Sequence, residues 1–195
     1  MQQPTDYEYP TDKHKYIVDL MRKFELCYDV SNRQVLLPDL LNVQEPQHSF
    51  PQENILRFRY EYDYLPKSIM PRLIVKLHAD IEGKLQWRTG IVLKARNWNA
   101  RARVRADKSA KRISIEVEGP QRRDYFAVIF YAIETIHEGF TKLKLDRKVP
   151  LPDHPEIAVS YEDLIYHREE KQKAILVGSL KKRYPVEKLL CSTRG

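Results

Sequence analysis

Two groups of side chains in this sequence have the residue types for chemistry: a run of cations between residues 88 and 112, and the scattered histidines and cysteines. Lysine and arginine neutralise phosphates, and aromatic rings stack on bases. The cations are Arg88, Lys94, Arg96, Arg101, Arg103, Arg105, Lys108, Lys111 and Arg112, and Trp87 and Trp98 lie among them. The run therefore permits a nucleic-acid interface. Its candidate residues are Arg88, Lys94, Arg101, Arg103 and Arg105.

The same run also fits the solvent-facing side of a β-sheet. Every second residue from 101 to 105 is an arginine, and the residues between them are small or apolar. This is the pattern of a strand with one buried face. If Ala106 pairs with Lys111, Arg101 lies opposite Glu116, and part of the charge is balanced across the strands. The run can then be a solvated surface without a ligand.

Metal binding, nucleophilic catalysis and phosphate-loop chemistry lack their motifs. The six histidines are scattered, and His137-Glu138 lacks the second histidine of a zinc-binding H-E-x-x-H helix. No serine sits in a G-x-S-x-G elbow. None of the six glycines forms the G-x-x-x-x-G-K-S/T loop that cradles nucleotide phosphates. We therefore expect no metal, no cofactor and no enzymatic activity in this chain.

The elements that would position the cations begin at residue 54. Apolar and charged residues alternate from Leu56 to Tyr62, which predicts a strand with one buried face. The period changes to four between Ile69 and Ile81, which predicts a helix that buries Leu73 and Leu77 against the sheet. Ser68 is placed to cap that helix.

Three further alternating segments predict an antiparallel meander: residues 85–93, 101–106 and 113–117. In the first of them Trp87 shares its face with Leu85 and Ile91, which favours a core position for the indole.

Helices flank this predicted sheet. Residues 122–140 have the strongest helical pattern, and Phe126 and Phe130 widen its apolar stripe beyond one face. Those rings either pack on the sheet or face another subunit. We also expect a helix at 13–26, a strand at 35–37, a linker at 44–52, a strand within 141–151, a helix capped by Ser160, and a short helix at 184–190.

The composition indicates a globular protein of one or two domains. The chain has 195 residues, of which 42% are hydrophobic and 31% charged, and a formal net charge of +7. That charge permits nucleic acid, acidic lipid or acidic protein as a partner without choosing among them. No apolar run approaches the roughly 18 residues of a membrane helix. The first residues have neither a basic nor an apolar region, so we expect no secretory signal. The two cysteines, Cys27 and Cys191, do not suggest a disulfide framework, so we expect a cytoplasmic protein and no membrane partner.

Two stretches carry a resemblance to a known family. The segment from Tyr64 to His78 reads YLPKSIMPRLIVKLH, and WRxGIVL follows from Trp87 to Leu93. Together they resemble the second half of the COR domain, which follows the Ras-like GTPase in Roco proteins. LMRKFELCYDV from Leu20 and VLLPDLL from Val35 resemble the end of the first COR half, which is winged-helix-like in that family. The resemblance suggests a prokaryotic leucine-rich-repeat GTPase.

The resemblance implies an α+β fold: an antiparallel meander with flanking amphipathic helices, preceded by the tail of a winged-helix-like subdomain. It places the end of the first COR half at residues 1–45, a linker at 46–53 and the second half at 54–195. It implies a non-catalytic module that couples homodimerisation to the nucleotide state of an adjacent Ras-like domain, which would bind the GTP or GDP. The candidate dimer interface is Arg123, Tyr125, Phe126 and Phe130. The alternative is a basic nucleic-acid-binding domain.

Overall fold

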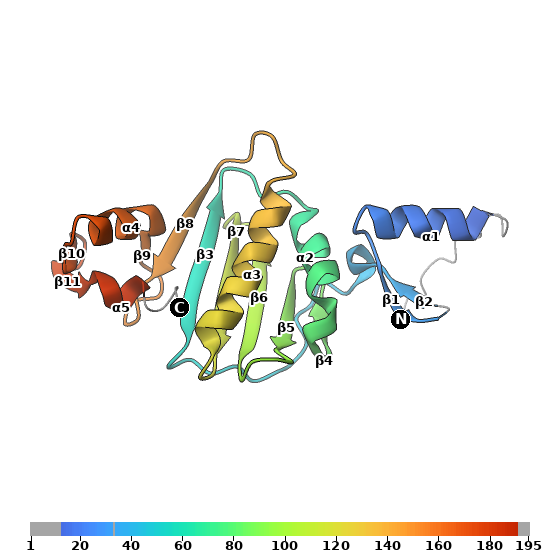
Figure 1. Cartoon of the computed structure of the whole chain (residues 1–195), viewed down its shortest axis with the longest axis horizontal. Coiled ribbons are helices and arrows are strands. Elements are labelled where there is room, and N and C mark those ends of the chain that lie inside the picture. Colours follow the sequence, from blue (N-terminus) through green and yellow to red (C-terminus); the bar gives the residue numbers. More distant parts are fainter. Residues whose placement is uncertain (1–12, 33, 191–195) are drawn as a thin grey trace.

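A computed structural model describes residues 13–32 and 34–190, and a seven-stranded antiparallel sheet forms its centre (Figure 1). In sheet order the strands are β4 (Ile81–Trp87), β5 (Gly90–Lys94), β6 (Arg101–Asp107), β7 (Arg112–Glu118), β3 (Leu56–Tyr62), β8 (Leu145–Pro150) and β9 (Ala158–Ser160). The predicted α+β fold and the antiparallel meander are confirmed.

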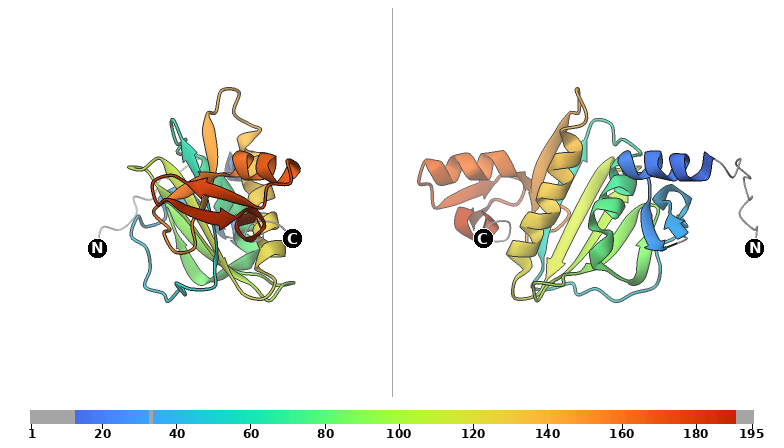
Figure 2. Two further views of the ribbon diagram at one scale, coloured as in Figure 1. Left: turned by 90° about the vertical axis from the view of Figure 1, so that its left-hand side faces the viewer. Right: turned by 45° about the vertical axis from the view of Figure 1, so that its right-hand side comes forward.

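Two helices, α2 (Ile69–Leu77) and α3 (Arg122–His137), lie side by side on one face of the sheet (Figure 2). The alternating apolar residues of β3, β6 and β7 point to these helices and form the core. Leu73 and Leu77 are 0% and 8% exposed, as the helical period predicts. α2 is shorter than expected, because a 3₁₀ turn at His78–Asp80 follows it and Ile81 already begins β4.

The predicted single strand at 85–93 is wrong. The chain ends β4 at Trp87, turns through two residues and returns as β5 from Gly90. A Cβ at Gly90 would lie 2.2 Å from the Trp87 ring, so this close turn requires glycine. Gln86 pairs with Ile91 and Trp87 with Gly90. The indole is buried at 2% exposure, but it lies on the face opposite Ile91, outside the main core.

A small N-terminal module contains α1 (His14–Lys23), β1 (Tyr28–Ser31), β2 (Gln34–Leu36) and a 3₁₀ turn at Pro38–Leu40. It is joined to the sheet domain through Glu25, whose carboxylate accepts hydrogen bonds from Arg72 and Lys76 of α2 at 2.9 and 2.6 Å. The helix α1 buries no residue. The winged-helix likeness and the domain boundaries remain predictions, and residues 1–12 of the predicted first COR half lie outside the described residues, as does Cys191.

A C-terminal module lies beyond β8 and contains α4 (Tyr161–Glu169), β10 (Ala174–Val177), β11 (Lys182–Pro185) and α5 (Val186–Leu190). The predicted cap at Ser160 is confirmed, because Ser160 Oγ accepts a hydrogen bond from the backbone N–H of Asp163. The predicted cap at Ser68 is wrong, because its side chain makes no capping hydrogen bond to α2. The β10–β11 hairpin was not predicted, and β11 takes the first residues of the expected 184–190 helix. No helix within the described residues combines the length and apolar character needed to cross a membrane.

Candidate functional site: the basic sheet face and the segment that covers it

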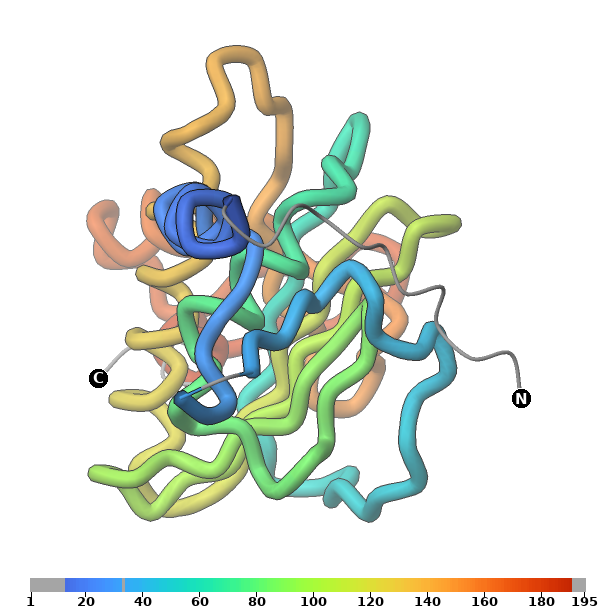
Figure 3. The backbone as a smooth tube through the Cα atoms, turned by 90° about the vertical axis from the view of Figure 1, so that its right-hand side faces the viewer, coloured from blue at the N-terminus to red at the C-terminus, as the bar shows by residue number. Residues whose placement is uncertain are grey.

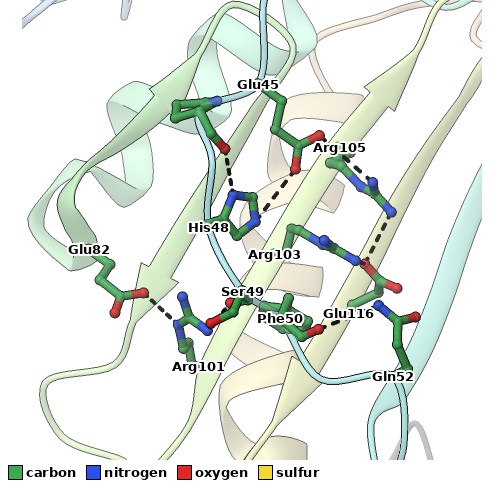
Figure 4. Close-up of polar contacts among 11 residues, drawn as sticks. Glu45, His48, Ser49, Phe50, Gln52, Glu82, Arg101, Arg103, Arg105 and Glu116 are labelled. Carbon is green, nitrogen blue, oxygen red and sulfur yellow. Dashed lines mark hydrogen bonds and ion pairs between the residues drawn. The ribbon is translucent and has the colours of Figure 1, made fainter.

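Residues 45–52, which we call the strap, run along the sheet face opposite α3 (Figure 3). Just before the strap, the backbone N–H of Arg88 donates a hydrogen bond to the carbonyl of Asn42 at 2.8 Å. Arg101 Nη1 donates to the carbonyl of Ser49 at 2.8 Å. The Phe50 ring is 8% exposed and lies 4.8 Å from the guanidinium of Arg103. The strap is therefore fastened to the cations that the sequence singled out (Figure 4).

The cations of the face are paired with carboxylates. The predicted register was wrong by two residues: Arg101 lies opposite Glu118, and Arg103 lies opposite Glu116. The Nη2 atom of Arg103 is 2.6 Å from the carboxylate of Glu116. Arg105 is 3.4 Å from the same carboxylate. The corrected register balances more of the charge than the predicted one, because each of two arginines faces a glutamate directly.

Of the five candidate cations, the structure brings Arg101, Arg103 and Arg105 together in one row along β6. Arg88 lies in the β4–β5 turn, and Lys94 is exposed at the end of β5. The side chains of Arg101 and Arg103 are only 22% and 11% exposed. The strap packs on this row of arginines. A solvated sheet face would explain why the arginines pair with carboxylates, but it would not explain why the strap covers them.

His48 and Phe50 were missed by sequence reasoning. The His48 side chain is 4% exposed and lies 3.5 Å from Glu45. Its Nδ1 is 2.9 Å from the carbonyl of Pro46, and its ring centroid is 6.1 Å from that of Trp87. The available signal was an aromatic ring and an imidazole within a segment otherwise read as a polar linker.

The candidate interface residues of α3 are not equivalent. Tyr125 and Phe126 are 0% and 3% exposed and belong to the core of this chain, which argues against an anchoring role for either ring. Arg123 and Phe130 are half-buried, and Phe130 packs edge-on against Phe58 at 5.6 Å. Tyr131 lies off the main apolar stripe of α3 and is 73% exposed. It was not among the interface residues singled out from the sequence.

A polar cluster lies under α3, where Arg147 of β8 donates two hydrogen bonds to Glu134 at 3.0 and 2.5 Å. Burial raises the pKa of Glu134, but contacts with His137, Arg147 and Tyr60 outweigh burial and lower the pKa to about 2. Arg147 approaches the Glu134 carboxylate more closely than His137 does, at 2.5 Å against 3.8 Å. The Tyr62 hydroxyl lies 2.9 Å from His137 Nε2, and desolvation raises the pKa of Tyr62 above its ordinary value. This cluster ties α3 to β3 and β8.

No three His, Cys, Asp or Glu side chains in the described part of the chain gather closely enough to hold a metal ion. What the site does contain is paired charges and apolar contacts, which suit binding of the strap to the sheet.

The chain is similar to known proteins at the level of a family model and of a curated relative. Residues 53–192 match the family model described as C-terminal of Roc, COR-B domain. The chain is also similar to a protein of Dictyostelium discoideum described as probable serine/threonine-protein kinase pats1, with 28% identity over 103 residues. That similarity covers 44% of this chain and only 3% of the relative's length.

Proposed function

The chain belongs to the COR-B family, and from that membership we propose that it is a non-catalytic dimerisation and regulatory module of a Roco-type GTPase. The observation that carries the proposal is the match over residues 53–192. In this proposal the adjacent Ras-like domain binds GTP or GDP, and its nucleotide state is coupled to homodimerisation of the module. The expected prokaryotic origin stays a prediction.

The outer face of α3 is the surface that suits self-association best. Ala127 and Tyr131 are exposed there, and Phe130 and Arg123 are half-buried beside them. Closed twofold pairing is the commonest arrangement of identical chains, so α3 would meet α3 across an axis. Tyrosine and arginine are frequent interface anchors, and a stable interface buries at least about 1,000 Å² in total.

The experiment compares the dimer dissociation constants of the unmodified chain and Tyr131→Glu by sedimentation equilibrium. Tyr64→Glu is the matched control, because Tyr64 is also largely exposed, at 66%, but lies outside α3. We expect Tyr131→Glu to keep its circular dichroism spectrum and to raise the dissociation constant on the order of 30-fold, the effect of an anchor worth about 2 kcal/mol. If both variants raised the dissociation constant equally, α3 would not form the dimer interface.

The nucleic-acid alternative has less support. Three of the five cations on which it depended, Arg101, Arg103 and Arg105, form ion pairs with Glu82, Glu116 and Glu118 beside the strap. Such arginines would have to leave these partners before they could neutralise a phosphate backbone.

A further inference from the structure

A groove with a volume of about 400 Å³ lies between α3 and α4, on the side of the molecule that the strap does not reach. Aromatic rings form its walls: Phe130 from α3, and Tyr161 and Tyr166 from α4. The centroids of the Phe130 and Tyr161 rings are 6.3 Å apart, so the two rings form one continuous wall. Tyr166 is 59% exposed and forms the outer rim.

The same groove is acidic. Its carboxylates are Glu134, Glu162 and Glu169, and its one cation is Arg147. Glu134 is neutralised by Arg147, which also reaches Glu162 at 3.2 Å. Three carboxylates against one guanidinium leave the groove negative in a chain whose net charge is +7. Glu162 is 56% exposed, and Glu169 is exposed as well.

Aromatic faces and carboxylates together are the surroundings that a cationic side chain prefers. The face of an aromatic ring attracts an ammonium or guanidinium group, and a nearby carboxylate adds a charged hydrogen bond. The floor of the groove already shows the charged part of this chemistry, because Arg147 lies between two glutamates from different helices. The rim repeats the same components, with Tyr166 beside Glu162 and Glu169 on α4 but no second cation lining the groove.

We propose that the groove between α3 and α4 binds a lysine or arginine side chain presented by a basic segment of a partner protein. Charge complementarity selects this occupant: a basic segment would be repelled by most of this chain and attracted to this groove. The rings would hold the aliphatic stem of the side chain, and Glu162 and Glu169 would hold its charged end. This interaction goes beyond the proposed self-association, whose surface on α3 meets the groove at Phe130.

The test titrates ¹⁵N-labelled chain with acetylated, amidated tetra-arginine and, separately, with tetra-glutamine, while following backbone amide shifts. We expect saturable shifts on α3 and α4 with tetra-arginine only. The double variant Glu162→Gln/Glu169→Gln should weaken binding about tenfold, because each exposed charge pair contributes roughly threefold to affinity. Tyr166→Ala should weaken binding about threefold, the effect of an exposed cation–π contact. Glu187→Gln, an exposed carboxylate on α5, should bind as the unmodified chain does.

Three results would overturn the proposal: no saturable shift, shifts on another surface, or an equal loss with Glu187→Gln. The occupant is also wrong if the double variant weakens self-association instead of peptide binding, because a second copy would then fill the groove. The dimer dissociation constant of each variant is therefore measured in parallel. A chain that binds the peptide but stays monomeric would contradict only the proposed dimerisation.

Discussion

The Phe50 ring lies against two guanidinium groups, 4.8 Å from Arg103 and 5.4 Å from Arg101, although it belongs to a segment without helix or strand. Both cations also hold carboxylates, so the ring and the ion pairs stabilise each other's positions. We expect Phe50→Ala to lower the free energy of unfolding by about 3 kcal/mol, the low end for a buried phenylalanine. Urea denaturation, monitored by fluorescence, measures this change in the free energy of unfolding.

Phe24→Ala is the control for that measurement. Phe24 is 61% exposed, so its loss should change the free energy of unfolding by less than about 0.5 kcal/mol. If both variants unfold at the same urea concentration, the strap contributes no stability and is not fastened to the sheet in the way described.

Glu134 makes the stability of the fold depend on pH in the acidic range. Its pKa falls from the ordinary 4.5 to about 2 in the folded chain, so the folded state favours the charged carboxylate. The stabilisation is fully present above pH 4.5 and is lost as the pH falls toward 2. Glu134→Gln should therefore be less stable than the unmodified chain at pH 7, and the difference should shrink between pH 4.5 and 2. Urea midpoints across this range measure it, and a difference independent of pH would contradict the assignment.

At the scale of elements, α2 links the N-terminal module to the sheet, since it buries one face on the strands and offers Arg72 and Lys76 to Glu25. Leu77→Ala should cost about 3 kcal/mol, because Leu77 is 8% exposed and its removal leaves a cavity in the core. Leu40→Ala, at a leucine that is 74% exposed, is the matched control. Equal melting temperatures of the two variants would show that α2 does not pack on the sheet.

The elements that the sequence predicted are those whose signal is local. The alternation from Leu56 to Tyr62 and the four-residue period of α2 follow from which side chains face the core, so neighbours in sequence carry the information. The β4–β5 turn was missed because alternation continues through Arg88 and Thr89, while only the close approach of Trp87 to Gly90 marks the turn.

The candidate site was predicted in part. The arginines of β6 were found because they alternate, but their carboxylate partners depend on a strand register that was wrong by two residues. The strap and the groove depend on contacts between segments distant in sequence. Arg101 and Ser49, for example, are 52 positions apart. No pattern within either segment indicates that pairing.

At the scale of the whole molecule, we propose that the chain regulates an adjacent GTPase domain and does not itself bind nucleotide. The chain has no phosphate loop, so a fluorescent guanine nucleotide should show no binding at micromolar concentration. A Ras-type GTPase in the same anisotropy assay provides the positive control. Saturable binding of the nucleotide to this chain would contradict its assignment as a non-catalytic module.

Self-association is the central claim, and static light scattering after size exclusion tests it most directly. The mass of one chain is 23.2 kDa. As the protein concentration rises from the micromolar range toward about 1 mM, the measured mass should climb from that value toward twice it, as expected for a dimer of micromolar affinity. A mass of 23.2 kDa at every concentration would contradict dimerisation by this chain.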